Sequence, residues 1–129
     1  MLDSLRISAT GLLAQKFRMN IIAQNLANVN TTRYRRKDVV FAAFKGFHPF
    51  LRSVKAEGVG VLGVIEDRSG YKLVYDPHHP DANSKGYVEM PNIDPVVEMV
   101  NMITASRAYE ANLVAISVAK SMALKAVEI

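Results

Sequence analysis

The sequence predicts a mainly α-helical protein in which long N- and C-terminal heptad helices pair as a coiled-coil-like core, with a small β-rich insert (a hairpin) between them. Apolar residues recur with heptad spacing toward both ends of the 129-residue chain, and most of its glycines and prolines lie between these ends. Three segments are therefore predicted: an N-terminal assembly helix at 1–32, a β-rich insert with a proline-rich loop at 33–92, and a C-terminal assembly helix at 93–129.

The first segment carries one heptad seam. Its core positions, seven residues apart, are Leu5, Leu12, Met19 and Leu26. The alternate seam positions are Leu2, Ala9, Lys16 and Ala23, and a second apolar row consists of Leu13, Phe17 and Ile21. The helix is expected from about Asp3 to Asn28 and should end in the asparagine-rich stretch that follows, because Asn tolerates the left-handed conformation of a helix terminus.

The middle segment changes to a strand-like pattern. Residues 39–41 are predicted to form a short strand, and residues 59–65 and 71–75 to form a hairpin around a turn at 66–70. A loop containing Pro77, Pro80 and Pro91 follows. An insert of this size is too small to be very stable alone.

The third segment begins with a clear helix start signal. Asp94 is the expected N-cap, Pro95 the first helical residue, and Glu98 an acid in the first turn. The predicted seam of this helix consists of Met99, Met102, Ser106, Tyr109, Leu113, Ile116, Lys120, Ala123 and Val127.

Both predicted helices are apolar on more than one face. Pairing the two helices covers the seams, but it leaves the row at 13–21 and a second row on the C-terminal helix, namely Val96, Val100, Ile103, Val114 and Val118. A helix that is apolar over most of its circumference needs cover on more than one side. The remaining apolar surface is therefore expected to be buried against other chains, which predicts a subunit of an assembly.

Charge is distributed unevenly along the chain. Residues 1–56 carry ten Lys/Arg and two acids, whereas residues 57–129 carry six Lys/Arg and ten acids. Such halves fit an anionic partner, or copies that pack with opposite fields together. A hydrophobic content of 50% argues against disorder. No membrane-spanning run and no cleavable secretory signal are predicted.

Several local motifs leave alternatives open. The amides Asn20, Gln24, Asn25, Asn28 and Asn30 fit a frayed helix end or, as we favour, side chains that fix the register between packed helices. The basic run 33–37 fits a phosphate contact, a solvated loop or an interface patch. No recognised nucleic-acid motif surrounds it, so nucleic-acid binding is the lesser hypothesis.

No catalytic, metal or cofactor site is predicted. Residues 76–81 place two histidines and two carboxylates together, but between prolines they favour a rigid turn over converging metal ligands, and His48 is isolated. The chain has no cysteine, and no nucleophile, phosphate-loop or zinc motif is present. An enzyme is therefore not expected.

Several blocks of the sequence resemble the flagellar axial proteins of the rod and hook type. The stretch 8–32 matches their N-terminal signature, with the motif residues Ala27, Asn28, Thr31 and Thr32. The short blocks that are similar to the short proteins of the proximal rod are 34–37, 39–41, 75–82, 86–88, 91–92, 98–100 and 105–112. The last of them includes Arg107, Glu110 and Asn112.

The resemblance implies a structural subunit of the bacterial flagellar basal-body rod, which crosses the periplasm and transmits torque. It also implies self-assembly with copies of the chain and with other rod proteins, contact with the export apparatus and basal-body base, and export by the flagellar type III apparatus. The terminal helices are then expected to pair only on assembly. A helical adaptor or export chaperone with one client is the main alternative.

Overall fold

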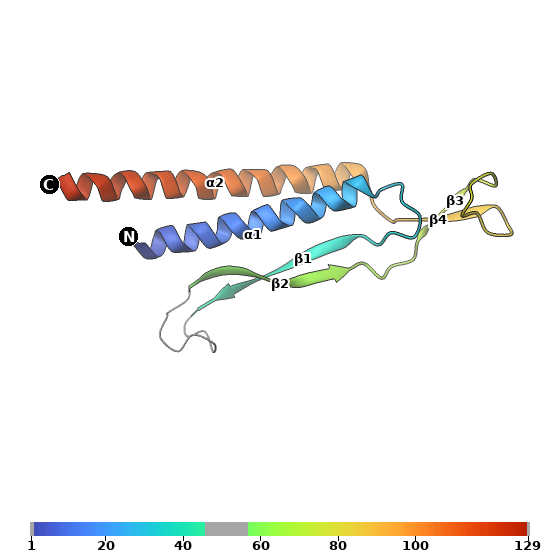
Figure 1. The fold of residues 1–129 in the computed structure, drawn as a ribbon, viewed down its shortest axis with the longest axis horizontal. Helices are drawn as coiled ribbons and strands as arrows, with labels where there is room; N and C mark the ends of the chain where they lie inside the picture. The colour runs from blue at the N-terminus through green and yellow to red at the C-terminus, as the bar shows by residue number, and fades with distance from the viewer. Residues whose placement is uncertain (1, 46–56, 129) are drawn as a thin grey trace.

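The computed structural model describes residues 2–45 and 57–128. Its elements are α1 (Leu2–Ala27), β1 (Lys37–Phe44), β2 (Gly58–Glu66), β3 (Lys72–Tyr75), β4 (Tyr87–Met90) and α2 (Pro95–Glu128). The two helices run antiparallel, so that both chain termini lie at one end of the molecule (Figure 1). The β1–β2 ribbon follows α1 on the side away from α2, and β3–β4 extends from the opposite end. His48 and the rest of 46–56 lie outside the described residues.

Helix α1 matches its predicted range within one residue at each end. At its C-terminus the Asn28 side-chain amide donates to the Gln24 carbonyl at 2.8 Å, and the Thr31 hydroxyl donates to Asn28 Oδ1 at 3.1 Å. Asn28 therefore caps the helix through its side chain. The expectation of a left-handed asparagine is wrong, because Arg33 is the only non-glycine with positive φ (60°) among the described residues.

Helix α2 starts as predicted. Asp94 Oδ1 accepts a hydrogen bond from the Val96 N–H at 3.0 Å, and the Asp94 carbonyl accepts one from the Glu98 N–H at 3.0 Å. The aspartate thus satisfies donors that every helix N-terminus leaves open, and the proline at the first position loses no hydrogen bond there.

The face that α2 turns toward α1 differs from the predicted seam. Met102, Tyr109 and Ile116 are half-buried as expected, but Met99 and Leu113 are 55% and 49% exposed. The alternate positions on the covered face are instead Glu98, Ala105, Asn112 and Ala119. The heptad pattern favoured the large apolar residues Met99 and Leu113. The side of α2 that packs closely on α1 instead carries smaller residues, such as Ala105 and Ala119.

Gly11 explains how closely the helices approach. A Cβ atom at Gly11 would lie 3.1 Å from the side-chain amide atoms of Asn112, tighter than an ordinary van der Waals contact. The glycine in α1 therefore makes room for Asn112 of α2, whose amide also donates to the Ala108 carbonyl at 3.1 Å.

The strand pairing corrects the predicted hairpin. The strands at 58–66 and 72–75 exist, but they do not pair with each other. β1 pairs with β2, from Lys37↔Glu66 to Phe44↔Gly58, with a bulge after Val40. β3 pairs with β4, which the sequence did not predict. Eight residues of β1 offer β2 a much longer ladder than four-residue β3 does, so the longer pairing prevails.

The β1–β2 ribbon covers one side of α1. Near one end of the ribbon the Val59 N–H donates to the Thr10 hydroxyl at 3.1 Å, and at the other end Asn25 bonds the backbone of Lys37. Ile21, expected to be uncovered, is buried with Ala14 and Ile22. Leu13 and Phe17 remain exposed, along a groove of about 250 Å³ between α1 and the start of β2.

Replacing Gly11 tests the close helix contact. Gly11→Leu improves the intrinsic helix propensity by roughly 0.5–1 kcal/mol, but its side chain must displace Asn112 and separate the helices. We expect a net loss of about 1–2 kcal/mol in the free energy of unfolding, measured by urea denaturation. Ala23→Leu, on the exposed face of the same helix, serves as the control and should change stability by less than about 0.5 kcal/mol. Equal effects of the two changes would contradict this packing.

Candidate assembly surfaces and the junction that orients them

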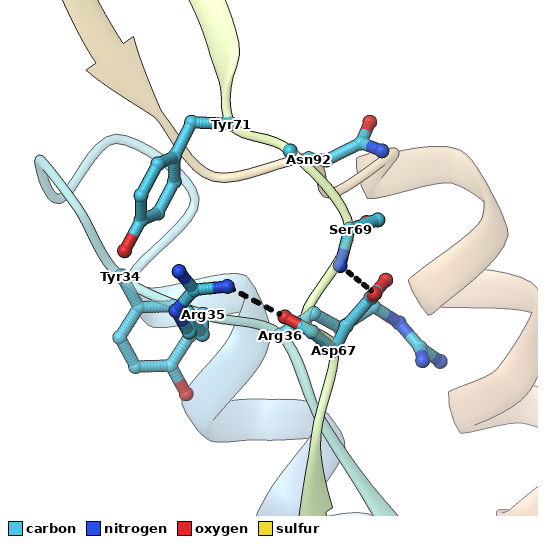
Figure 2. A pocket seen from close by; sticks show the side chains of 8 residues that line it. Tyr34, Arg35, Arg36, Asp67, Ser69, Tyr71 and Asn92 are labelled. Atoms are coloured by element: carbon cyan, nitrogen blue, oxygen red, sulfur yellow. Dashed lines mark hydrogen bonds between the residues drawn. The ribbon is translucent and has the colours of Figure 1, made fainter.

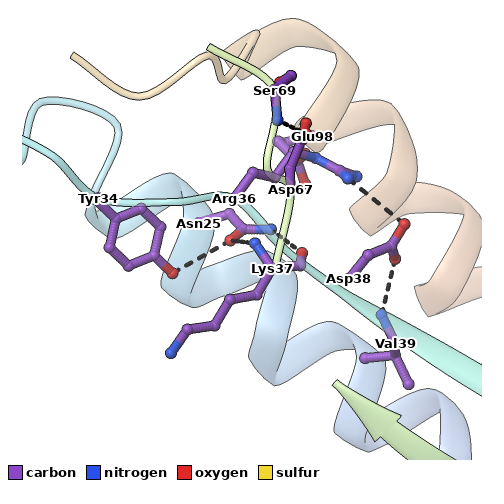
Figure 3. Close-up of polar contacts among 9 residues, drawn as sticks. All are labelled: Asn25, Tyr34, Arg36, Lys37, Asp38, Val39, Asp67, Ser69 and Glu98. Atoms are coloured by element: carbon purple, nitrogen blue, oxygen red, sulfur yellow. Dashed lines mark hydrogen bonds and ion pairs between the residues drawn. The ribbon is translucent and has the colours of Figure 1, made fainter. Parts of the chain in front are cut away.

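An ion pair between a half-buried arginine and a buried glutamate joins the start of β1 to the first turn of α2. Arg36 Nε donates to Glu98 Oε1, and Arg36 Nη1 lies 3.5 Å from Asp38 Oδ2 (Figure 3). Glu98 is only 1% exposed. Burial acts to lower the pKa of the Arg36 guanidinium, but the hydrogen bond to Glu98 and the charges of Glu98 and Asp38 outweigh it and raise the pKa. The guanidinium therefore stays charged, and its contact with Glu98 connects segments 62 residues apart.

The position of Glu98 in α2 also favours the ion pair. Its carboxylate lies in the first turn of α2, where the helix dipole favours negative charge. Its second oxygen, Oε2, is buried and has no hydrogen-bond donor among the described residues. The buried carboxylate therefore depends mainly on Arg36 for its compensation.

Asn25 joins α1 to the same place. Its side chain is fully buried, donates to the Lys37 carbonyl at 2.7 Å and accepts from the Lys37 N–H at 2.9 Å (Figure 3). The Tyr34 hydroxyl donates to the same Asn25 oxygen at 3.2 Å. The amide thus fixes where β1 begins along α1. The favoured interpretation, register between packed helices, is corrected for Asn25, because its partner is strand backbone.

The basic run 33–37 is occupied by contacts within the chain. Arg33 Nε lies 3.3 Å from Glu89 Oε2, and Arg35 stacks on the Tyr71 ring at 4.7 Å while donating to the Asp67 carbonyl at 3.3 Å (Figure 2). Lys37 lies 5.9 Å from the centre of the Tyr34 ring. These cations connect the start of β1 with β4 and with the segment after β2. The run therefore lies beside the contacts of Asn25, Arg36 and Glu98 that join α1, β1 and α2, which we call the junction.

The turn after β2 is held by a hydrogen bond of its own and lies against the arginines at the start of β1. The Ser69 N–H donates to Asp67 Oδ1 at 2.8 Å, which holds the pKa of the Asp67 carboxyl below its usual value, and the charges of Arg36 and Arg35 act in the same direction (Figure 2). The cavity that these residues line has room for about 10 Å³, the space of one water molecule.

The side of α2 opposite α1 is an exposed apolar stripe, which we call the rear face. Its apolar members are between 53% and 67% exposed: Val96, Val100, Ile103, Val114 and Val118. The predicted second row is therefore left uncovered by residues 2–45 and 57–128. Two charged residues of the family motif, Arg107 and Glu110, lie exposed in the middle of this stripe.

The other predicted residues divide between the helix pair and its ends. In α1 four seam residues are half-buried, namely Leu5, Leu12, Met19 and Leu26. Of the motif residues, Asn28, Thr32 and Asn112 are half-buried, and Ala27 and Thr31 are exposed. Sequence reasoning missed Arg36, Gly11 and the pairing role of Glu98, because each depends on a partner distant in sequence.

The β-strands also leave apolar residues uncovered. Leu62, Val64 and Ile65 of β2 and Leu73 and Val74 of β3 are exposed. The exposed apolar surface of the chain therefore extends beyond α2, which is unusual for a protein that functions alone.

The histidine-containing segment forms the expected turn. The His79 N–H donates to the Asp76 carbonyl at 3.2 Å, and His79 Nδ1 accepts from the Asp81 N–H at 3.0 Å. Within residues 2–45 and 57–128 no group of three or more His, Asp or Glu side chains is arranged to hold a metal ion. Neither described helix combines the length and hydropathy that crossing a bilayer requires.

Comparison with known proteins identifies the class. Residues 5–35 match the family described as "Flagella basal body rod protein", and residues 84–129 match "Flagellar basal body rod FlgEFG protein C-terminal". The chain is thus built like a flagellar rod protein at both helical ends, a structural and non-enzymatic class.

Full-length relatives narrow the class. The chain is 44% identical to the flagellar basal-body rod protein FlgC of Bacillus subtilis, with 98% of this chain and 95% of the relative covered. It is 46% identical to FlgC of Borreliella burgdorferi (93% and 91% covered) and 42% identical to FlgC of Escherichia coli O6:H1 (97% and 94% covered). The chain therefore belongs to the FlgC family of flagellar basal-body rod proteins, and it is a structural component of the basal body.

The buried pair can be tested against an exposed pair in the same chain. Arg36→Met leaves the buried Glu98 carboxylate uncompensated and should lower the free energy of unfolding by about 3–5 kcal/mol. Arg33→Met removes the pair with Glu89, whose side chains are 67% and 46% exposed, and should cost less than about 1 kcal/mol.

The double variant Arg36→Met/Glu98→Gln separates charge from packing. Because it removes both charges of the pair, it should recover a large part of the loss caused by Arg36→Met, as measured by urea denaturation. A double variant as unstable as Arg36→Met would contradict the assignment of the loss to an unpaired carboxylate.

Proposed function

We propose that this chain polymerises through its terminal helices into the proximal part of the flagellar rod, where it transmits torque across the periplasm. The observation that carries the proposal is the rear face of α2, an apolar stripe that no other part of the described chain covers. Burial of such residues stabilises an assembly by about 25 cal/mol per Å² of apolar surface removed from water.

The arrangement of the chain suits a rod subunit mechanically. The α1–α2 pair supplies a long two-helix segment, and the junction of Arg36, Glu98 and Asn25 fixes the β-strands relative to it. Close packing in a completed helical core resists shear, because protein interiors are as dense as organic crystals. In this proposal the segments 1–32 and 93–129 form the coiled-coil-like core on assembly, and 33–92 connects the core to its surroundings.

The partners in this proposal are copies of the chain and other rod proteins, together with the base of the basal body. Family membership supports contact with other rod and basal-body components. Export through the flagellar type III apparatus belongs to the same proposal. The assembly role extends to the seam residues on both helices and to the motif residues at the end of α1 and in the middle of α2.

A charge on the rear face tests the assembly role. Because the Ile103 side chain is exposed, Ile103→Asp should keep the free energy of unfolding of the isolated chain within about 0.5 kcal/mol of wild type. The same change should exclude the chain from the rod, because assembly would bury an unpaired charge. Ile103→Met retains apolar character at the same position and serves as the control. The measurement is the amount of chain in purified basal bodies, together with swimming motility, in a strain whose own copy is replaced. Wild-type incorporation of the Asp variant would refute this role of the rear face.

A further inference from the structure

The rear face of α2 begins with four apolar side chains that have the spacing of a socket for a neighbour's side chain. In close helix packing, an inserted side chain lies among residues i, i+3, i+4 and i+7 of the facing helix. Near the junction all four positions of one such set are apolar and between 55% and 67% exposed, namely Val96, Met99, Val100 and Ile103. We call these four residues the α2 socket. No described part of the chain fills it, because every member remains more than half exposed.

A bulge in β2 presents a side chain that matches the socket in chemistry. The residues on either side of Leu62, Val61 and Gly63, pair with consecutive residues of β1, so Leu62 itself has no partner on β1. A bulged residue of this kind bends the strand and re-aims its side chain. Leu62 is 65% exposed, and a Cβ atom built on Gly63 would meet no atom within 4 Å, so the surface beside Leu62 is open. Leu62 is therefore an apolar side chain that the described chain leaves largely uncovered.

Two charged residues of the β1–β2 ribbon complement the two charges on the rear face. Lys45 and Glu57 follow directly on the last residue pair of the ribbon, at its end remote from the junction, and both are exposed. Within the described chain neither these two side chains nor Arg107 and Glu110 form an ion pair. Burying an unpaired charge is costly, so a neighbour that covers the rear face must supply the opposite charges.

The apolar and charged residues follow the same order along both surfaces. Glu57 lies about 16 Å from Leu62 along β2. Arg107 and Glu110 lie about 11 Å and 16 Å from the middle of the socket along α2. Strand β2 runs toward the junction and α2 runs away from it, so on both surfaces the charges lie on the side of the chain termini (Figure 1). Two copies that point in the same direction therefore bring opposite charges together when Leu62 enters the socket.

We propose that in the assembled rod Leu62 of one copy inserts into the α2 socket of an adjacent copy. Two ion pairs fix this contact, in which Arg107 and Glu110 beside the socket meet Glu57 and Lys45 of the first copy. The inference rests on the proposed function, because it applies to the assembled chain, in which both terminal helices are paired. It deepens that function by naming the surface that covers the rear face.

The contact joins opposite sides of the molecule and is therefore open-ended. Helix α1 lies between α2 and the β1–β2 ribbon, so the socket and Leu62 of one chain are on different sides (Figure 1). Contacts between different faces continue from copy to copy until the ring closes or a helical assembly forms, whereas a contact between two identical faces ends at a dimer. Each copy thus receives one neighbour in its socket and supplies Leu62 to another, as a rod subunit requires.

Cysteine cross-linking in purified basal bodies tests this contact, because the chain has no cysteine of its own. In a strain whose own copy is replaced by Leu62→Cys/Val100→Cys, mild oxidation should give disulfide-linked dimers and longer multimers of the chain on a non-reducing gel. A link within one chain is prevented by the helix between the two positions. Each single variant should stay monomeric. Multimers formed by Leu62→Cys alone would indicate a contact between identical faces and would overturn the inference.

A matched pair of cysteines supplies the control for distance. Ala115 is also exposed on α2, but it lies about 22 Å from Val100 along the helix, too far for a disulfide with a Cys that reaches the socket. Leu62→Cys/Ala115→Cys should therefore enter the rod and give no multimers. Multimers in equal amount from both double variants would contradict the assigned register.

A photoreactive residue identifies the occupant directly. Leu62→p-benzoylphenylalanine should, on illumination of purified basal bodies, attach to residues 96–103 of another copy of this chain, as read by mass spectrometry. Attachment to a different rod protein alone would assign Leu62 to that protein and would overturn the inference.

Charge reversal tests the same contact without cysteine, so poor incorporation of a cysteine chain leaves the inference testable. Arg107→Glu should lower the amount of chain per basal body about tenfold or more, because like charges then meet at the contact. Arg107→Glu/Glu57→Arg restores the opposite charges and should recover to within about twofold of wild type. Arg107→Glu/Glu128→Arg has the same net charge and should remain as low as Arg107→Glu. Equal recovery by both double variants, or none by the first, would overturn the inference.

The outcomes separate this contact from the proposed function. Rods that contain the Leu62→Cys/Val100→Cys chain without cross-links overturn the contact and leave the proposed function standing, as does a rear face that excludes Ile103→Asp but shows no charge recovery with Glu57→Arg. Absence of the wild-type chain from purified rods would overturn the proposed function itself.

Discussion

The arrangement of this chain depends on one ion pair, between Arg36 and the buried Glu98. The β1–β2 ribbon packs on α1 but is separated from α2 by that helix, so the junction is where strand and second helix are joined directly. Asn25 adds α1 through the backbone of Lys37. Because all three elements meet at one end, a small rotation there would move the far ends of the helices by many ångströms.

The junction also explains why a buried charge is retained in so small a protein. A hydrophobic pair of similar volume often stabilises a fold as well as an ion pair does, but it specifies geometry less strictly. Here Arg36 has a directional hydrogen bond to Glu98 and a second acidic neighbour, Asp38. For a subunit that must present two helices and a ribbon in fixed relation to its neighbours, orientation is the property that matters.

Local signals in the sequence were sufficient for the helices and insufficient for the pairings. Asp94 and Pro95 mark the start of α2 because capping involves residues a few positions apart. The strand prediction was wrong for the same reason. A glycine-containing turn at 66–70 suggested a hairpin with the next strand, whereas β2 pairs with β1, which precedes it in the chain. The heptad rule placed Met99 and Leu113 in the seam by size, because the fit of Asn112 to Gly11 cannot be read from one helix alone.

The exposed residues are the more informative part of the prediction. Val100, Ile103 and Val114 were expected to lack cover within the chain, and the described part of the chain leaves them exposed. Their exposure follows from topology, because an antiparallel two-helix layer with strands on one side leaves the other side of the outer helix open (Figure 1). A third layer would cover that side, but this chain has no further element to supply one in its described residues.

The charges on the rear face limit which neighbour can supply the missing layer. An apolar stripe alone accepts many neighbours, since hydrophobic burial is not directional. Arg107 and Glu110 restrict the choice, because a neighbour that buries them must present the opposite charges at matching positions. In the proposed rod, that neighbour is a surface of an adjacent subunit.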